Sequence, residues 1–333
     1  MTYKEGLIAN VEAMTVSILI PVKGDNENLR KSIGHCLELD YPDFEIIVLP
    51  DAPIVLPYGD KVRVIPTGNV CPAKKRDGAI DKVKGELLAF LDDDAYPRND
   101  WLKNAVIHFS ANEVAAVCGP AITPDSDTLQ QKASGFIYSS FLASGRHKRR
   151  YVPDKLCEVD DYPSCNFLVR KDVFQQVGGF DTTLWPGEDT ILCLKITNEL
   201  NKKIIYDPKV LVYHHRRPLF IPHLKQIKNY SLHRGYFVKR FPDTSLRLSY
   251  FIPSIFVLGL ISGGIISIFF KTISFFYFGF IAVYLTLVAI ELFRGISLGV
   301  FGVSMVFIGI VLTHLVYGFY FIRGLFSKRL PEE

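Results

Sequence analysis

The run Leu87-Leu88-Ala89-Phe90-Leu91-Asp92-Asp93-Asp94 changes within one residue from wholly apolar to wholly acidic. A short apolar run before a Tyr-Pro break is typical of a strand that is buried on both faces of its sheet. The carboxyl end of such a strand is where open α/β sheets bind ligands. Adjacent carboxylates repel one another, and a divalent cation with oxygen ligands neutralises them. The run therefore predicts a metal-bound phosphate site.

The segments on either side of this run alternate between strand-like and helix-like patterns. Strands are predicted at 16–21, 44–49, 62–65, 114–117, 204–206 and 210–213, and helices at 27–37, 72–84, 99–109, 172–177 and 188–200. Such alternation predicts an α/β domain with a parallel, doubly wound sheet. Residues 120–163 have poor periodicity and are expected to be rich in loops.

The overall composition excludes some partners. The chain has 333 residues and a net charge of +4, which is too small to predict nucleic-acid binding. Basic residues do cluster, at Arg146-His147-Lys148-Arg149-Arg150 and at Arg216-Arg217. The first cluster follows apolar residues 136–142, which suits either an anionic membrane surface or a solvated loop beside a packed helix. The six cysteines lack metal-site spacing and the N-terminus is polar, which favours a reducing, cytosolic location for residues 1–245.

Apolar residues dominate the chain after Tyr250. Three stretches, at about 250–270, 273–292 and 296–322, approach or exceed the ~20 residues that cross a bilayer core. We therefore expect an α/β domain at 1–245 and an all-α membrane domain at 246–333 with three transmembrane helices. The alternative is two spans with one re-entrant or surface segment. Three spans would put Arg323, Lys328 and Arg329 on the far side from the first domain, against the positive-inside tendency, so the topology stays open.

Four motifs follow one another in a recognisable order. They are Ile20-Pro21-Val22, a strand that ends at Asp51, the triple carboxylate, and Gly178-Gly179-Phe180-Asp181 with Gly187-Glu188-Asp189. With these motifs, the chain from about residue 16 to about residue 241 resembles the family 2 glycosyltransferases. The resemblance implies the GT-A fold, which is a Rossmann-like nucleotide-binding domain, a UDP- or GDP-sugar donor, and inversion at the sugar carbon.

The same resemblance assigns the residues that would bind the donor. It implies that Asp92 and Asp94 form an Asp-x-Asp pair that binds Mg²⁺ or Mn²⁺, and that His214 or His215 approaches the metal. It places the nucleotide sugar beside Pro21, Val22, Asp25, Asp51, Lys75, Arg76, Asp92, Asp93, Asn166 and Arg234. For the charged residues a solvated helix face or a turn is the alternative interpretation, and for Asn166 a turn position. No Trp follows Arg234, so the Gln-x-x-Arg-Trp motif of processive relatives is absent.

Glu188 and Asp189 stand at the start of a predicted helix. Direct displacement at a sugar carbon needs a carboxylate opposite the leaving group, to take the proton of the acceptor hydroxyl. The resemblance implies that Asp189 is this base, with Glu188 beside it. The alternative interpretation is favourable charge in the first turn of a helix.

These features together predict a membrane-anchored glycosyltransferase that adds one sugar to a lipid-linked or glycan acceptor. Hydrophobic segments directly after the catalytic domain would hold it at the cytosolic face of a bacterial or archaeal plasma membrane, among membrane lipids. A processive polysaccharide synthase is an alternative, against which the missing Trp motif and the absence of an N-terminal span argue. A non-catalytic membrane scaffold is another, against which the intact acidic motifs argue.

Overall fold

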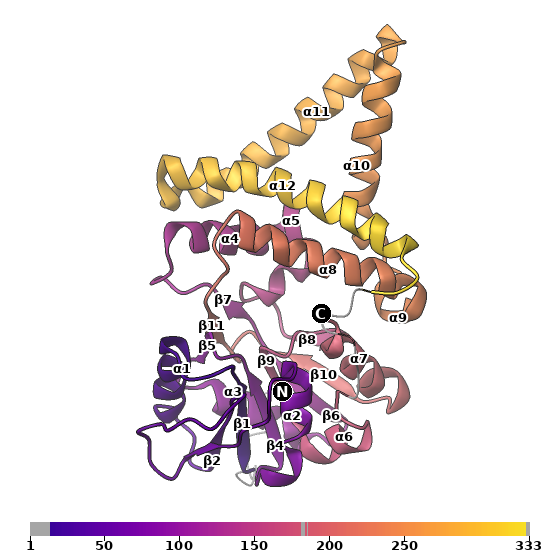
Figure 1. Cartoon of the computed structure of the whole chain (residues 1–333). Coiled ribbons are helices and arrows are strands. Elements are labelled where there is room, and N and C mark those ends of the chain that lie inside the picture. Colours follow the sequence, from indigo (N-terminus) through magenta and orange to yellow (C-terminus); the bar gives the residue numbers. More distant parts are fainter. Residues whose placement is uncertain (1–13, 181–183, 185, 331–333) are drawn as a thin grey trace, which may run out of the picture. The chain divides into compact units, whose positions relative to one another are not determined.

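The computed structural model describes residues 14–180, 184 and 186–330. These residues pack as two compact units, which are coloured along the chain in Figure 1. The first unit comprises the chain up to Ile122 together with Val152–His214, and the second comprises Thr123–Tyr151 together with the chain from His215 onward. Packing thus divides the chain at other places than the single boundary expected at residue 245.

An eight-stranded sheet forms the centre of the first unit. Its spatial order is β3 (Val62–Val64), β2 (Phe44–Leu49), β1 (Val16–Pro21), β4 (Leu87–Leu91), β9 (Asn166–Arg170), β6 (Val114–Cys118), β10 (Lys203–Tyr206) and β8 (Cys157–Val159). Every residue of β1, β2, β4 and β6 is buried, as their apolar sequences predict. The α/β fold is therefore confirmed.

The prediction of a parallel sheet is wrong, because the sheet contains both parallel and antiparallel pairs. Strand β1 runs parallel to β2 and β4, but β9 is antiparallel to both of its neighbours, and β8 is antiparallel to β10. Parallel neighbours need a crossover connection, which the segments between β1, β2 and β4 provide. The chain enters β9 only after it has passed through residues 123–151 of the second unit, so no such crossover fixes its direction.

Helices cover both faces of this sheet in the first unit (Figure 1). They are α1 (Glu27–Leu37), α2 (Pro72–Asp77), η1 (Ile80–Lys82), α3 (Trp101–Val106), η2 (Ile107–Ser110), α6 (Lys171–Gln176), α7 (Glu188–Leu194) and η4 (Lys195–Glu199). The helix expected at 72–84 is shorter than predicted, because α2 ends at Asp77 and a separate 3₁₀ turn follows.

A small second sheet lies beside the carboxyl end of β4. It consists of β5 (Ala95–Pro97), β11 (Val212–His214) and β7 (Ala121–Ile122), in the order β5-β11-β7. In the antiparallel pair of β11 and β5, His214 stands opposite Ala95. This register brings the imidazole next to the acidic residues that precede Ala95.

The second unit is helical. It contains α4 (Leu129–Ser139), α5 (Phe141–Ser144), η3 (Gly145–Arg150), α8 (Ile221–Arg240), α9 (Pro242–Ser245), α10 (Leu248–Ser267), α11 (Lys271–Leu292), η5 (Phe293–Leu298) and α12 (Gly299–Phe326). Residues 120–163 were predicted to be rich in loops, but α4, α5 and η3 fill much of this stretch. A capping box between Thr128 and Gln131 starts α4. Helix α8 belongs to this unit because it packs along α12.

Two helical stretches among the described residues are long and apolar enough to cross a membrane. They are Leu248–Ser267 and the continuous run Lys271–Phe326, in which α11, η5 and α12 follow one another. Length and composition do not establish how many crossings they make, so the three expected spans remain a prediction.

Candidate active site

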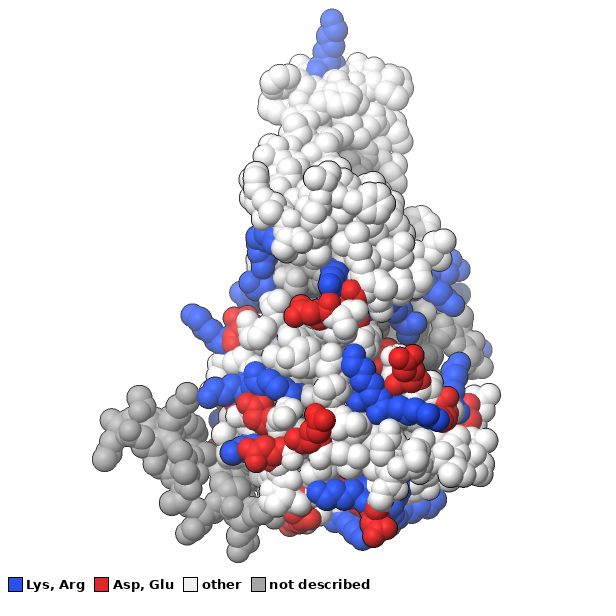
Figure 2. Space-filling model, turned by 90° about the vertical axis from the view of Figure 1, so that its left-hand side faces the viewer, with Lys and Arg blue, Asp and Glu red and all other residues white. Residues whose placement is uncertain are grey.

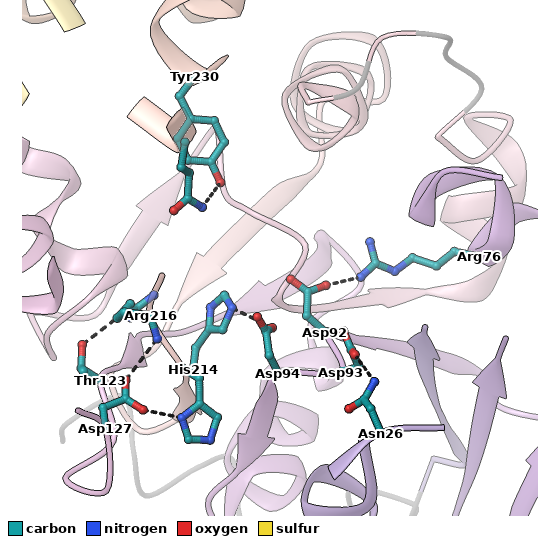
Figure 3. Close-up of polar contacts among 12 residues, drawn as sticks. Asn26, Arg76, Asp92, Asp93, Asp94, Thr123, Asp127, His214, Arg216 and Tyr230 are labelled. Carbon is teal, nitrogen blue, oxygen red and sulfur yellow. Dashed lines mark hydrogen bonds and ion pairs between the residues drawn. The ribbon is translucent and has the colours of Figure 1, made fainter. Parts of the chain in front are cut away.

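The three carboxylates that follow β4 each have a different partner (Figure 3). Arg76 donates from Nη2 to Asp92 Oδ1 at 2.8 Å, and Asn26 donates from Nδ2 to Asp93 Oδ2 at 2.9 Å. His214 Nε2 lies 3.0 Å from Asp94 Oδ1. Burial raises the pKa of Asp93, and its two acidic neighbours add to that rise against the hydrogen bond from Asn26. The acidic run is therefore a folded cluster with defined partners.

Asp92, Asp94 and His214 form a group that fits a divalent cation. Their potential ligand atoms all lie within 4.8 Å of one another. Two carboxylates and an imidazole are ligands that Mn²⁺ accepts, and Mg²⁺ is commonly held by one or two carboxylates with the phosphates of its substrate. Burial lowers the pKa of His214, but Asp94 and a hydrogen bond with Cys165 outweigh it and bring the pKa to about 10. Because a metal binds the neutral imidazole, its binding would release this proton.

His215 is not part of this group. Its Nδ1 pairs with Asp127, and the same carboxylate accepts a hydrogen bond from the backbone N–H of Arg216 at 3.1 Å. Successive side chains of an extended chain point to opposite sides, so only one of two adjacent histidines can face the carboxylates. Of the two histidines expected near the metal, only His214 therefore stands with the carboxylates, and its role as a ligand stays a prediction.

The expected nucleotide-binding residues meet at the ends of β1 and β2. Lys75 is almost fully buried, donates to the carbonyl oxygens of Val22 at 2.8 Å and Leu49 at 3.2 Å, and forms an ion pair with Asp51. Pro21 ends β1 directly before Val22. The structure thus brings Pro21, Val22, Asp51 and Lys75 together. Lys75 is fixed by the protein itself, while a quarter of the Asp51 side chain stays exposed.

Asp25 lies on the loop before α1. It is paired with Arg30, whose Nε donates to Asp25 Oδ1 at 2.9 Å, and this pair lowers the pKa of Asp25. Its neighbour Asn26 caps α1 and contacts Asp93. The contact from this loop to the acidic run is therefore made by Asn26, which the sequence reasoning did not single out.

A continuous series of contacts connects the two acidic motifs. Arg76, with its side chain 1% exposed, donates to Asp92 and also from Nη1 to Ser164 Oγ at 2.9 Å. The backbone N–H of Ser164 donates to Asp189 Oδ2 at 3.1 Å. Within the described residues, the buried Nε of Arg76 has no hydrogen-bond partner. Hydrogen bonds therefore connect four residues into one cluster: Asp92, Arg76, Ser164 and Asp189.

Glu188 and Asp189 stand side by side at the start of α7, where Glu188 is buried and Asp189 is partly buried. Burial raises the pKa of both, and Asp189 adds a like charge that raises the pKa of Glu188 further. Arg76 and the backbone N–H of Ser164 oppose the rise at Asp189. Both carboxylates accept from the backbone, because the N–H of Gly187 donates to Glu188 Oε2 at 2.9 Å and the N–H of Ser164 donates to Asp189 Oδ2. The two groups therefore titrate as one coupled pair with raised pKa values, which suits proton transfer.

A tight turn precedes this pair. Gly179 has φ of +70°, and a Cβ built on it would come within 2.5 Å of Asp77 Oδ1. The same carboxylate oxygen accepts the backbone N–H of Phe180 at 3.0 Å. Glycine is therefore required at this position by both conformation and space. Asp181, the last residue of the Gly-Gly-Phe-Asp motif, lies outside the described residues.

Asn166 has partners within the protein for both polar atoms of its side chain. The side chain is fully buried, donates to the carbonyl oxygens of Gly119 at 2.7 Å and Val210 at 2.8 Å, and accepts from Trp101 Nε1 at 2.8 Å. It is the first residue of β9 and not a turn residue. Asn166 therefore joins neighbouring segments, and a contact with the donor stays a prediction.

Arg234 belongs to α8 in the second unit. Its Nη1 donates to Ser245 Oγ at 3.2 Å, and its guanidinium lies 4.8 Å from the ring centroid of Tyr250. A contact between Arg234 and the diphosphate of a donor stays a prediction.

Two residues of the site were missed from sequence. Asn26 carries the signal of an N-cap before a helix, but nothing in its neighbourhood shows that it reaches Asp93. Ser164 lies next to the Asn166 that was singled out, yet it is Ser164 that connects Arg76 with Asp189. Both contacts join residues more than twenty positions apart, so local pattern cannot reveal them.

Comparison with known proteins finds a family match in the N-terminal half of the chain. Residues 17–178 match the family model described as Glycosyl transferase family 2. A pre-mycofactocin glycosyltransferase of Mycobacterium tuberculosis is 32% identical over 146 residues, which are 44% of this chain and 30% of that protein. A glucosyl-dolichyl phosphate glucuronosyltransferase of Haloferax volcanii is 26% identical over 137 residues, which are 39% of this chain and 43% of that protein. The chain thus spans less than half the length of these two relatives.

Among solved structures, a mannosyltransferase from Pyrobaculum calidifontis in complex with GDP-Man and Mn²⁺ superposes with a TM-score of 0.49 at 16% identity. The alignment covers 68% of this chain and 63% of that one. The family match and the mixed α/β sheet together agree with the expected GT-A fold.

Proposed function

Because the chain is a family 2 glycosyltransferase, with its family domain at residues 17–178, we propose that it transfers one sugar from a UDP- or GDP-sugar to a lipid-linked acceptor with inversion at the sugar carbon. The observation that carries this proposal is the connected cluster of Asp92, Arg76, Ser164 and Asp189. It joins the acidic run at the end of β4 to Asp189, a carboxylate whose pKa is raised by burial.

The donor would lie along the carboxyl ends of β1, β2 and β4. Asp51 keeps an exposed edge that can accept from the nucleoside, and Arg76 fixes the Asp92 carboxylate through its Nη2. Asp92, Asp94 and His214 would hold Mg²⁺ or Mn²⁺, which supplies Lewis-acid stabilisation of the departing diphosphate. These residues account for donor binding without any contribution from Asn166 or His215.

The transfer itself would be a direct displacement. The acceptor oxygen forms its bond to the anomeric carbon while the bond from that carbon to the diphosphate oxygen breaks, and the proton of the acceptor hydroxyl passes to Asp189. Ser164 positions Asp189 through its backbone N–H, and Glu188 beside it shares the raised pKa of the pair. Attack from the side opposite to the leaving group inverts the configuration of the carbon.

Two features support a lipid-linked acceptor. The haloarchaeal relative is named for a glucosyl-dolichyl phosphate, which is a sugar carried on a lipid. The second unit of this chain carries two helical stretches of membrane-spanning length and apolarity. We therefore place the enzyme at a membrane, with the first unit on the cytosolic side where nucleotide sugars are made.

The test is a donor and acceptor screen with the full chain in lipid vesicles. UDP- and GDP-sugars are supplied one at a time with Mn²⁺ or Mg²⁺ and a lipid extract, and both released nucleoside diphosphate and labelled lipid are measured. We expect one donor to give labelled lipid only with metal, and EDTA to stop the reaction. If no donor binds or reacts above the level of heat-inactivated protein, the proposal is wrong.

A further inference from the structure

Helix α12 is fastened to α8 along most of its length. Thr313 Oγ1 lies 3.0 Å from His223 Nε2, and Lys239 Nζ donates to the carbonyl of Ser327 at 2.9 Å. Between these points the backbones approach closely, because a Cβ on Gly324 would stand 2.0 Å from the carbonyl oxygen of Leu232. Farther toward its N-terminus, α12 packs on α4, with Gly309 against Ile137. Figure 1 shows α12 and α8 running side by side.

The sequence of α8 prevents it from entering hydrocarbon. Its 20 residues include Lys225, Lys228, Arg234, Lys239 and Arg240 and no acidic residue, and Lys225, Lys239 and Arg240 are exposed. Charged side chains within a bilayer are costly unless they are paired or face a water-filled cavity. Helix α12 could cross a membrane only by separating from α8 or by taking these cations with it.

The face of α12 opposite to α8 exposes large apolar side chains. Four residues, Phe301, Ile308, Phe319 and Phe326, are between 49% and 77% exposed. At 100° per residue their positions fall within about 20° of one another, so they form a single straight stripe. Because α8 and α4 take the other side of α12, this stripe is the side of the helix that is left for lipid.

The hairpin of α10 and α11 has the opposite character. It projects from α12 on the side away from α8 (Figure 1), and its surface is almost free of charge (Figure 2). Lys271, at the turn of the hairpin, is the only charged residue between Arg247 and Glu291. Exposed side chains such as Ile261, Ile265, Phe276 and Val283 leave no polar face to meet water.

We propose that only the α10–α11 hairpin enters the core of the bilayer and that it leaves on the face by which it entered. Helix α12 then lies along that face with its phenylalanine stripe toward the acyl chains and α8 on the water side. Arg247, Arg294, Arg323 and Lys328 all remain on one side, which agrees with the positive-inside tendency that three spans would violate. The inference rests on the proposed membrane setting but not on the catalytic assignments.

The test is a depth profile of the stripe. A spin label is placed on the full chain by substituting Phe301→Cys, Ile308→Cys, Phe319→Cys or Phe326→Cys, and its collisions with oxygen and with a water-soluble nickel complex are measured in anionic vesicles. We expect four similar, shallow depths. A crossing helix would instead separate Phe301 and Phe326 by about 37 Å along its axis, which gives shallow ends and a deep middle.

Either of two other outcomes would also overturn the inference. Labels that collide only with the nickel complex would mean that the stripe faces water, and spin–spin broadening without oxygen collisions would mean that a second copy covers it. Leu258→Cys and Ile265→Cys on α10 serve as controls that should lie progressively deeper. The unsubstituted protein gives the background from the native cysteines.

Sidedness provides a second, independent measurement. Lys225→Cys on α8 and Lys328→Cys after α12 should react with a membrane-impermeant maleimide in the same vesicle preparation, whether inverted or right-side-out. Reaction from opposite sides would show an odd number of crossings and contradict the proposal. Because neither readout requires sugar transfer, a flat depth profile with an inactive enzyme would refute only the proposed function.

Discussion

The two units of this chain use charge in opposite ways. The first contains 20 Lys and Arg against 28 Asp and Glu, whereas the second contains 18 against 6. In the first unit, acidic groups converge at strand ends, and several of them pair with specific partners. In the second, basic groups lie on helices whose neighbours are apolar.

The difference separates charged groups that would take part in the reaction from charged groups that would hold the protein at a membrane. Buried carboxylates with raised pKa values are expensive and are expected where a reaction needs them. Exposed cations beside apolar helices are inexpensive in water and attract an anionic bilayer. The net charge of +4 is the sum of an acidic first unit and a basic second unit, so it hides the opposite charges of the two.

The largest expected effect is on the reaction in the first unit. Asp189→Asn should reduce sugar transfer by about 10² to 10⁴-fold, because it removes the group that takes the acceptor proton. Donor affinity, measured by equilibrium dialysis of the nucleotide sugar, should change little. Glu38→Gln, at an exposed carboxylate of the same unit, is the matched control and should leave both quantities unchanged. Transfer by Asp189→Asn near the wild-type rate would place the base elsewhere.

The next largest effect is on the metal requirement, which should differ between substitutions of two adjacent histidines in different units. His214→Gln should raise the Mn²⁺ concentration needed for half-maximal activity by about 10 to 100-fold, as loss of a group that binds or orients the metal does. His215→Gln, whose native partner is Asp127, should leave that concentration unchanged. Equal effects of the two substitutions would remove His214 from the metal site.

Most of the fold, but only part of the site, could be predicted from sequence. Apolar runs such as Leu87–Leu91 correctly predicted the buried strands, because a strand that is covered on both faces has apolar residues at every position. The direction of β9 could not be read, since an antiparallel strand and a parallel strand have the same apolar pattern. The position of Asp92 and Asp94 at a strand end followed from the sequence, whereas the choice between His214 and His215 did not.

Two expected site residues show the limit of sequence patterns. Asn166 was selected from a family motif and His215 from its place after a strand, but their partners, Trp101 and Asp127, are more than sixty positions away in the chain. Whether a polar side chain serves a ligand or the protein depends on those distant partners. A sequence pattern does not contain that information.

A moderate effect is expected for the residue that joins the acidic motifs. Ser164→Ala removes the hydroxyl that accepts from Arg76 but keeps the backbone N–H that positions Asp189. We expect turnover to fall about tenfold, because one hydrogen bond to a charged group is worth about 1.5 kcal/mol. Ser164→Thr should recover most of the loss because it restores the hydroxyl. A full-rate Ser164→Ala enzyme would show that the connection between the motifs is unimportant for turnover.

In the second unit, the basic run in η3 should matter for membrane attachment and not for chemistry. Replacing Lys148 and Arg149 by Gln should weaken binding to anionic vesicles by about 5-fold per residue at low salt, and little to neutral vesicles. Vesicle flotation at two ionic strengths measures this effect. Equal binding to neutral and anionic vesicles by the unsubstituted chain would contradict the comparison of the two units.

The smallest effect concerns pH. Because burial raises the pKa of Asp189, the acid limb of kcat/KM should lie above the pKa of about 3.9 of a free aspartate. The hydrogen bond from Glu188 lowers the pKa of Asp189, so Glu188→Ala should move the limb to higher pH, by about one unit or less. Glu188→Gln can still donate and should leave it in place. An unchanged limb in Glu188→Ala would show that the pair is not coupled.

The stereochemistry of the product tests the central claim most directly. The claim is that one displacement, assisted by Asp189 at the end of a connected cluster with Asp92, joins the sugar to its acceptor. The anomeric configuration of the first-formed product, read from the proton coupling constant in its NMR spectrum, should be opposite to that of the donor. Retention of the donor configuration would contradict a single displacement and with it the role given to Asp189.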